Sequence, residues 1–251
     1  MKKTVMAILG LVTALVVLAA CGNNNNDRPE LHMATSADFP PFEFITPAGE
    51  FDGFDIHMAR AIAEILDMEL VIHDMEFVSA IASTQTGNTD ITIAALSITD
   101  DRRQQVNFSI PYFETTLVII VQQDSEIQTV ADLDVEGNAI AVQMGTTSDM
   151  MATWYLDNVD VQRFVNAPMT VMELNANRVD AIVIDAGVAS QFIDDNPNLR
   201  ILSNPLGVEQ YAIAVYMGNP ELLEQIDDAL QQLMDNGELD RIYNMFFGGD
   251  E

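Results

Sequence analysis

Cysteine and lysine are nearly absent from this chain. Its single cysteine, Cys21, has no partner in the sequence, which excludes an intramolecular disulfide. Both lysines stand at positions 2 and 3, and the eight basic residues that follow are all arginines. The formal net charge is −29 at pH 7, and −31 without the two lysines. So acidic a surface repels phosphate groups, and we therefore expect no nucleic acid partner and no binding to anionic lipid headgroups.

Histidine is scarce as well, and its three copies, His32, His57 and His73, are scattered. The sequence holds no Ser-His-Asp order and no His/Cys cluster at metal-ligand spacing. It therefore predicts no catalytic residue, no metal site and no cofactor.

Long apolar runs are missing after the N-terminal segment, so we expect no membrane-spanning helix there. Residues 1–20 have the organisation of a secretory signal peptide: charged Lys2-Lys3, a mostly apolar stretch at 5–17, and small residues at 18–20. The run is shorter than the ~20 residues of a span. Residues 18–21, Leu-Ala-Ala-Cys, resemble the bacterial lipobox, which implies a lipid on Cys21 and a protein held outside the cytoplasm by that lipid alone. Residues 21–29 read as a polar tether.

Strands and helices alternate along the rest of the chain, which predicts an α/β fold with doubly wound sheets. Strands are expected at 30–34, 69–73 and 91–96, with helices at 56–66 and 78–81 between them. A middle block, with strands at 117–121, 139–142 and 181–184, has its own sheet. The helical tail at 220–246, interrupted near Gly237, returns to the first lobe. We therefore expect one lobe from 30–114 and 211–251, a second from 115–210, and two crossings near 113–117 and 206–211.

Polar residues follow the apolar run at 91–96, where open α/β sheets bind ligands. Ser97 and Thr99 offer hydroxyl groups, and Arg102 or Arg103 offers a guanidinium that matches a carboxylate. The alternative is that Ser97 and Thr99 cap a short helix with Asp100 and Asp101 in its first turn and both arginines in solvent.

Seven segments in order resemble the extracellular solute-binding proteins of ABC importers, in the subfamily that binds polar amino acids. The resemblance runs from about Leu31 to Phe246. It implies a two-lobe fold of the type II periplasmic-binding-protein class, in which each lobe is a mixed sheet flanked by helices and two strands cross between them. The segments are Ala-Asp-Phe-Pro-Pro-Phe-Glu-Phe at 37–44, Gly-Phe-Asp-Ile at 53–56, Ala-Leu-Ser-Ile-Thr-Asp-Asp-Arg-Arg at 95–103, Phe-Ser-Ile-Pro-Tyr at 108–112, Gly-Thr-Thr at 145–147, Val-Asp-Ala-Ile-Val-Ile-Asp at 179–185 and Tyr-Ala-Ile-Ala-Val at 211–215.

The resemblance also implies how an amino acid would be held. Its carboxylate would meet Arg102 and main-chain N–H groups near Ser97 and Thr147. Its ammonium would meet Asp185, the Ser97 hydroxyl and the carbonyl of Ala95. The aromatic rings expected on either side of the ligand's aliphatic part are those of Phe39 and Phe54.

Some assignments stay open at this stage. Thr146 is expected to cap a helix or to bind, and Asp185 could also be a helix N-cap. Ser36 and Gln143 occupy positions that set selectivity in related proteins, and both are neutral here. A polar uncharged ligand is therefore preferred, with arginine or another cationic amino acid as the alternative. Asp38 is the nearest acid, and the sequence does not say whether it faces the cleft.

The expected function is capture of a free amino acid by hinge closure, for an ABC permease and its ATPase, by a monomer. One alternative is an enzyme, because cyclohexadienyl dehydratases share this fold. Another is a sensor that passes its ligand state to a membrane receptor.

Overall fold

The computed structural model describes residues 28–248. The expected signal peptide, Cys21 and most of the expected tether lie outside this range. Arg28 and Pro29, the last two residues of the expected tether, contact the first lobe. The Arg28 side chain forms an ion pair with Asp67 at 2.9 Å, and the Pro29 carbonyl accepts a hydrogen bond from the Glu69 N–H at 2.8 Å.

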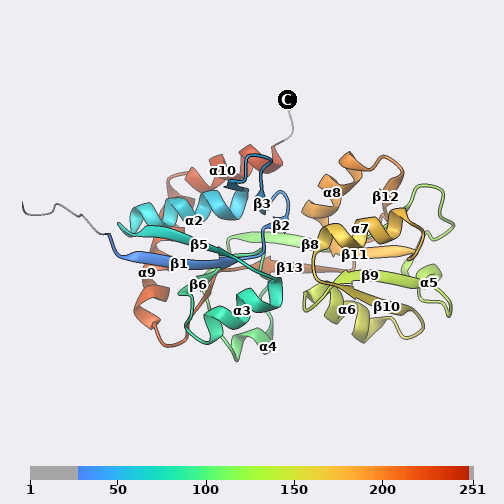
Figure 1. Cartoon of the computed structure of the whole chain (residues 1–251), viewed down its shortest axis with the longest axis horizontal. Coiled ribbons are helices and arrows are strands. Elements are labelled where there is room, and N and C mark those ends of the chain that lie inside the picture. Colours follow the sequence, from blue (N-terminus) through green and yellow to red (C-terminus); the bar gives the residue numbers. More distant parts are fainter. Residues whose placement is uncertain (1–27, 249–251) are drawn as a thin grey trace, which may run out of the picture.

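Two sheet-containing lobes lie side by side (Figure 1). The first lobe is built on a five-stranded sheet in the order β5-β1-β6-β14-β7. Strand β1 is parallel to β5 and β6, and β14 is antiparallel to β6 and β7. Its strands are β1 (Glu30–Thr35), β5 (Glu69–Asp74), β6 (Ile91–Thr92), β7 (Asn107–Phe108) and β14 (Ala214–Val215), and its helices are α2 (Phe54–Ile65), α3 (Phe77–Gln85), α4 (Asp100–Arg103), α9 (Pro220–Asp235) and α10 (Glu238–Phe247).

The second lobe has a six-stranded sheet in which β10-β9-β11-β8-β12 are neighbours and β13 also pairs with β8. Strand β9 is parallel to β10 and β11, whereas β8 is antiparallel to β11, β12 and β13. The elements are β8 (Phe113–Gln122), β9 (Ala139–Gln143), β10 (Asp160–Phe164), β11 (Ala181–Asp185), β12 (Leu199–Ile201) and β13 (Gly207–Tyr211), with helices α5 (Val130–Leu133), α6 (Thr147–Tyr155), α7 (Ala167–Asn175) and α8 (Ala186–Asp195).

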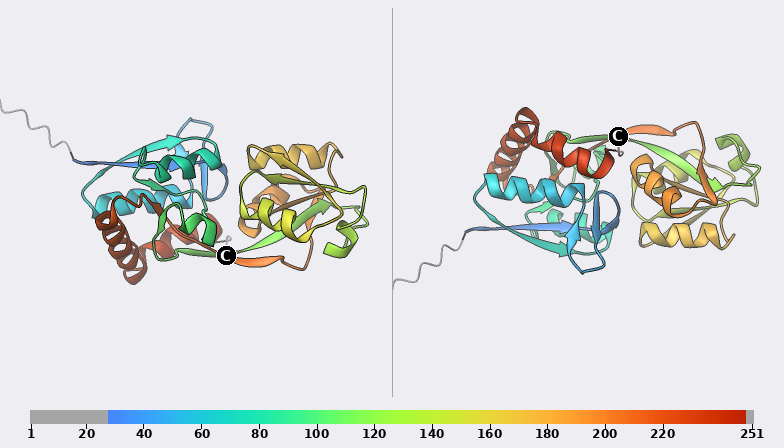
Figure 2. Two further views of the ribbon diagram at one scale, coloured as in Figure 1. Left: turned by 90° about the horizontal axis from the view of Figure 1, so that it is seen from below. Right: turned by 90° about the horizontal axis from the view of Figure 1, so that it is seen from above.

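The chain passes between the lobes through β8 and β13, which pair with each other from Phe113–Tyr211 to Leu117–Gly207. Both views in Figure 2 show these strands, green and orange, side by side at one edge between the lobes, and the right-hand view shows the red helix α10 ending beside them. Helix α10 packs there through Phe247, whose ring centroid lies 5.1 Å from those of Phe42 and Phe113. One hydrophobic core cluster therefore continues from the first lobe through the crossing into the second.

Most expected elements are present, but two strands are shorter than the apolar pattern predicts. The strand expected at 91–96 ends at Thr92, since Ala95 has a left-handed backbone with φ +45. The apolar stretch at 211–217 likewise divides into the end of β13 and the two-residue β14. Between β1 and α2 the chain forms a small sheet of β2 (Asp38–Phe39), β3 (Glu43–Ile45) and β4 (Phe51–Asp52). Gly237 separates α9 from α10, as expected.

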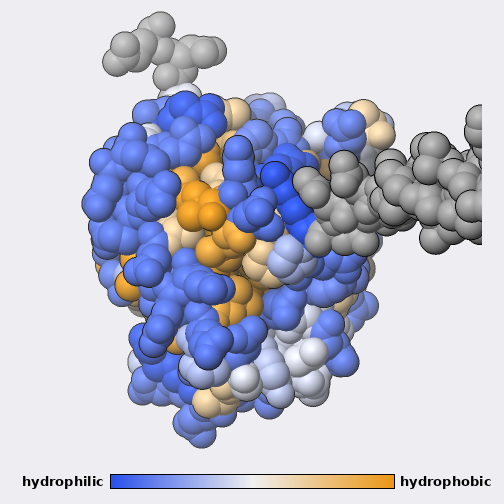
Figure 3. Space-filling model, turned by 90° about the vertical axis from the view of Figure 1, so that its left-hand side faces the viewer, coloured by the Kyte–Doolittle hydropathy of each residue, from blue (hydrophilic) through white to orange (hydrophobic). Residues whose placement is uncertain are grey.

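Hydrophilic residues cover most of the end of the first lobe that faces away from the second, with a limited hydrophobic area among them (Figure 3). Within residues 28–248, no helix combines the length and the apolar character that crossing a membrane requires.

Candidate functional site

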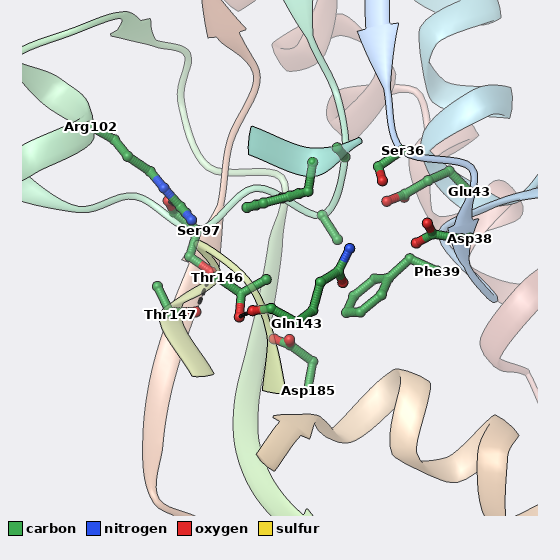
Figure 4. Close-up of a pocket in the computed structure, with 13 residues that line it drawn as sticks. Ser36, Asp38, Phe39, Glu43, Ser97, Arg102, Gln143, Thr146, Thr147 and Asp185 are labelled. Carbon is green, nitrogen blue, oxygen red and sulfur yellow. Dashed lines mark hydrogen bonds between the residues drawn. The ribbon is translucent and has the colours of Figure 1, made fainter. Parts of the chain in front are cut away.

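The ends of several strands in both lobes meet around one cavity (Figure 4). Arg102 of the first lobe and Asp185 of the second both line it. The cavity volume is only about 10 Å³, which is room for about one water molecule. The lining residues are Ser36, Asp38, Phe39, Glu43, Phe77, Ala94, Ala95, Ser97 and Arg102 from the first lobe, and Gln143, Thr146, Thr147 and Asp185 from the second.

Arg102 is fixed by a short capped helix. The Thr99 hydroxyl accepts a hydrogen bond from the Arg102 N–H at 3.2 Å, and α4 begins there with Asp100 and Asp101 in its first turn. The capping alternative is therefore correct for Thr99, yet the Arg102 side chain is only 3% exposed. Its Nη1 donates to the Ser97 carbonyl at 2.6 Å. Burial lowers the pKa of Arg102 to about 10, which still leaves it a cation at neutral pH.

Two further contacts hold the Arg102 guanidinium. Nη2 donates to the carbonyl of Gly145, in the second lobe, at 3.1 Å. The guanidinium carbon lies 5.3 Å from the centroid of the Phe77 ring, within the range of a cation–π contact. Arg103, the other guanidinium that the sequence offered, is exposed.

The second lobe contributes the turn from Gln143 to Thr147, where β9 leads into α6. The Thr146 hydroxyl caps α6 by accepting from the Asp149 N–H at 3.3 Å, and it donates to the Gln143 carbonyl at 2.8 Å. Thr146 thus caps the helix and also lines the cavity. The first N–H groups of α6 have no partner within the helix and favour an anion at this end.

The hydroxyls of Ser97 and Thr147 come from different lobes but share one partner. Oε2 of Glu209, on the crossing strand β13, accepts from Ser97 Oγ at 2.6 Å and from Thr147 Oγ1 at 2.8 Å. The two hydroxyl oxygens are 3.4 Å apart. Glu209 was not among the predicted site residues, because the segment 206–211 was expected only as a crossing between the lobes.

Asp185 ends β11 and is 6% exposed. Its Oδ1 accepts a short hydrogen bond from the Tyr211 hydroxyl. It precedes α8, but its side chain makes no capping hydrogen bond, so the N-cap alternative does not describe its side chain. The pKa of Asp185 is raised to about 7, mainly by burial. The charge of Glu209 also raises this pKa, whereas the hydrogen bond from Tyr211 and the charge of Arg102 lower it.

A second group of acids lies opposite Arg102, around Ser36, Asp38 and Glu43 (Figure 4). Asp38 Oδ1, both carboxyl oxygens of Glu43 and the Ser36 hydroxyl are buried and find no hydrogen-bond partner in the described part of the chain. Burial, followed by the charge of Asp74, raises the pKa of Asp38 to about 7. Burial and then Asp55 raise the pKa of Glu43 well above its ordinary range. Asp38 therefore does face the cavity, which the sequence left open, whereas Glu43 was not predicted.

Phe54 does not line the cavity, contrary to expectation. It is 1% exposed, and its ring lies 6.3 Å from that of Phe42 and 5.6 Å from that of Phe113, within the aromatic core beside the crossing. Phe39 does line the cavity, and the second aromatic ring there is that of Phe77. Phe77 begins α3, one residue before the helix expected at 78–81, and it was not among the predicted site residues.

The arrangement suits a zwitterion more than a reaction. One end presents a fixed guanidinium and a helix N-terminus, and the other presents carboxylates. No histidine lines the cavity. His32 contacts His73 and His57 contacts Asp52 elsewhere in the first lobe. Among residues 28–248, no group of three or more His, Cys, Asp or Glu side chains is arranged to hold a metal ion.

Comparison with known proteins gives consistent results. A family model described as bacterial extracellular solute-binding proteins, family 3, matches residues 31–249. A probable histidine-binding protein of Neisseria gonorrhoeae is 30% identical, over 98% of this chain and 96% of that protein. The arginine-binding extracellular protein ArtP of Bacillus subtilis is 28% identical, over 97% of this chain and 98% of its own length. Both are named as binding proteins.

Solved structures agree with this result. A mutant of ArgBP from T. maritima superposes with a TM-score of 0.83 at 40% identity, covering 88% of this chain and 96% of that one. An ancestral amino acid-binding protein, described as a precursor of cyclohexadienyl dehydratase, gives a TM-score of 0.82 at 31% identity, covering 87% of this chain and 95% of that one.

Proposed function

Because this chain belongs to family 3 of the bacterial extracellular solute-binding proteins, we propose that it captures a free amino acid outside the cytoplasm and delivers it to an ABC permease and its ATPase. The names of its relatives as amino acid-binding proteins support this role. The protein acts as a monomer, and Cys21 anchors it to the membrane through lipid alone. That anchor rests on the sequence of residues 18–21.

The backbone of the amino acid spans the two lobes. Its carboxylate binds the Arg102 guanidinium and the free N–H groups at the start of α6, near Thr147. Its ammonium binds Asp185, the Ser97 hydroxyl and the Ala95 carbonyl. Arg102 lies on α4 of the first lobe and Asp185 at the end of β11 in the second, so each end of the ligand is held by a different lobe.

The side chain of the ligand is cationic, with arginine as the leading candidate. The observation that carries this proposal is the group of buried, unpartnered oxygens on Ser36, Asp38 and Glu43. Buried carboxyl groups without partners are unfavourable, and a guanidinium or ammonium would supply several donors at once. This replaces the preference for an uncharged ligand, which rested on the neutral side chains of Ser36 and Gln143. Phe39 and Phe77 line the cavity and provide apolar surface for the aliphatic part of the ligand's side chain.

Binding requires the lobes to move apart and close again. An amino acid does not fit into a cavity of about 10 Å³. The contacts of Arg102 with Gly145, and of Ser97 with Thr147, join the lobes in this closed form. The moving bodies are residues 30–114 with 211–251, and residues 115–210. They pivot on the β8–β13 ribbon, and a ligand that binds the closed form better than the open one shifts the equilibrium towards closure.

Binding of a solute, rather than catalysis, fits the site. The cavity holds no paired nucleophile and base, and the compared relatives are named as binding proteins. The dehydratase alternative is tested by incubating purified protein with prephenate or arogenate, and turnover of either would support it. The receptor-sensor alternative is tested by reconstitution with the permease, because only an import component stimulates its transport.

A thermal-shift screen of the twenty amino acids tests the proposal. A ligand that binds only the folded state, present at a hundred times its dissociation constant, stabilises that state by about 2.7 kcal/mol. We expect L-arginine, and to a lesser degree L-lysine, to raise the melting temperature more than L-glutamine does. A shift with glutamine alone would reject the cationic side chain, and no shift with any amino acid would reject the function.

A further inference from the structure

Glu209 stands behind the two hydroxyls that face the ligand site. It is half-buried on β13, opposite Thr115 of the other crossing strand. Its Oε2 lies within 2.8 Å of both Ser97 Oγ and Thr147 Oγ1. Glu209 itself is not a lining residue of the cavity, but lines a separate groove between α4 and α6. A ligand in the cavity therefore has no need to displace it.

The chemistry of this contact fixes the direction of both hydroxyl groups. An ionised carboxylate can only accept hydrogen bonds, whereas each hydroxyl has one hydrogen to donate and two lone pairs. Both hydrogens therefore point to Glu209. The short distance between the two hydroxyl oxygens adds no third hydrogen bond, since neither has a hydrogen left to give.

We infer that Glu209 is a positioning residue that turns the Ser97 and Thr147 hydroxyls into pure acceptors towards the bound ligand. This inference rests on the proposed function. With their hydrogens engaged, the hydroxyls present only lone pairs to the cavity. Lone pairs attract the ligand's ammonium and repel its carboxylate. The carboxylate must then take its hydrogen bonds from Arg102 and from main-chain N–H groups alone.

Glu209 thereby sets the orientation in which an amino acid enters the site. Among the charges that raise the pKa of Arg102, that of Glu209 has the largest effect, followed by that of Asp185. The negative charge of Glu209 partly offsets the attraction of Arg102 for an anion. Removing that charge should leave carboxylate binding intact or strengthen it, and weaken only ammonium binding. A purely structural role would affect both ends of the ligand alike.

The replacement Glu209→Gln separates these roles because it keeps the shape of the side chain. The amide oxygen can still accept from one hydroxyl, but the amide NH₂ donates to the other and turns that hydrogen away from residue 209. One hydroxyl then opposes the ammonium. Calorimetry with L-arginine is compared with 5-guanidinopentanoic acid, which has the same chain and carboxylate but no ammonium.

We expect the variant to bind L-arginine about tenfold or more weakly and the des-amino acid as well as the wild type does, or better. Glu114→Gln is the matched control, an exposed glutamate on the paired crossing strand. It should change neither affinity. Unchanged binding of the des-amino acid also shows that Glu209→Gln is folded.

An equal loss for both ligands, or no loss for either, would overturn the inference. A second measurement is a double-mutant cycle of Glu209→Gln with Thr147→Val, which removes one of the hydroxyls. We expect the two changes to be less than additive for L-arginine, whereas full additivity would contradict action through Thr147. A wild-type protein that binds no amino acid would instead reject the proposed function.

Discussion

Arg102 is a buried cation, and within the described chain no carboxylate forms an ion pair with it. Two carbonyls and the Phe77 ring hold it in place. Such a group is costly to bury unless an anion completes its environment, and its planar fork is already oriented for one. The Arg102 guanidinium is therefore already held in position to bind the carboxylate of a ligand.

The first prediction concerns the two charges that span the site. Arg102→Ala and Asp185→Ala should each weaken amino acid binding by on the order of 2–5 kcal/mol, because each strands one charge of the ligand in a buried site. Calorimetry gives the affinities, and circular dichroism checks that both variants keep the fold. Unchanged affinity in either variant would show that its side chain is not part of the site.

The second prediction concerns Asp38, whose carboxyl oxygen Oδ1 is buried and unpartnered within residues 28–248. Asp38→Asn should weaken L-arginine binding by about tenfold or more and change L-glutamine binding much less, because it removes the charge that faces the cationic side chain. The exposed Asp101, changed to Asn, is the control. Equal losses for arginine and glutamine would argue against this contact.

The pKa of Asp38 adds a pH dependence to the same residue. Burial and Asp74 raise that pKa to about 7, so the free carboxyl is largely protonated at pH 6. A cationic ligand binds the ionised form, and its affinity should therefore rise with pH, by up to about tenfold per unit, and level off above pH 7. Asp38→Asn should make this profile less steep in calorimetric titrations from pH 5.5 to 8, and the remaining dependence is due to Asp185, whose pKa is also raised to about 7. An unaltered profile in that variant would show that Asp38 does not contribute to the dependence.

At the scale of elements, the turn after β9 contacts the other lobe directly. Gly145 has φ +77, and a methyl group added there would lie 2.6 Å from Cγ2 of Val78 on α3. The turn thus needs glycine both for its backbone and for closure of the cleft.

The third prediction follows from this contact. Gly145→Ala should weaken ligand binding by about tenfold, because the added methyl group collides with Val78 only when the lobes close. Adding Val78→Ala should restore much of the affinity. Gly137→Ala is the control for backbone strain, because Gly137 has φ +101 and nothing within 4 Å of the added carbon. If Gly137→Ala weakens binding as much, strain and not closure is responsible.

The elements also show what the sequence could and could not predict. Apolar periodicity placed most helices and both sheets, since burial on one face leaves a regular pattern. It failed at Ala95, where the buried Asp55 carboxylate accepts from the Ala95 N–H at 2.7 Å and the backbone leaves the strand. It also could not say which way a side chain points in a loop or at a helix start, which is why Asp38 stayed open, Phe54 was misplaced and Glu43, Phe77 and Glu209 were missed.

At the scale of the whole molecule, the large negative charge and the buried acids both make the folded state less stable as pH rises. Burial raises the pKa of Asp38 and Asp185 to about 7 and that of Asp55 to about 6. These values exceed the ordinary 3.8. The folded state therefore binds more protons than the unfolded state between about pH 4 and pH 7. The stability that these three protonated carboxyl groups contribute is lost as pH rises through 7.

The fourth prediction is that the ligand-free protein melts at a higher temperature at pH 5 than at pH 8. A difference of at least about 3 °C corresponds to about 1 kcal/mol in a chain of this size. Thermal unfolding at constant ionic strength measures it, and Asp38→Asn should reduce the difference. Greater stability at pH 8 would mean that paired surface carboxylates outweigh the buried ones.

The second lobe begins along the chain at β8 and ends at β13, and residues 117–206 between the paired parts of these strands form one uninterrupted stretch. Half of the binding cleft can therefore be exchanged as a single cassette with two junctions. A graft of this stretch from a relative would bring its own partners for Arg102 while keeping Asp38 and Glu43 of the recipient. Such chimaeras would show whether side-chain preference follows Asp38 and Glu43 of the recipient, because zwitterion binding uses Arg102 from one half and Asp185 from the other.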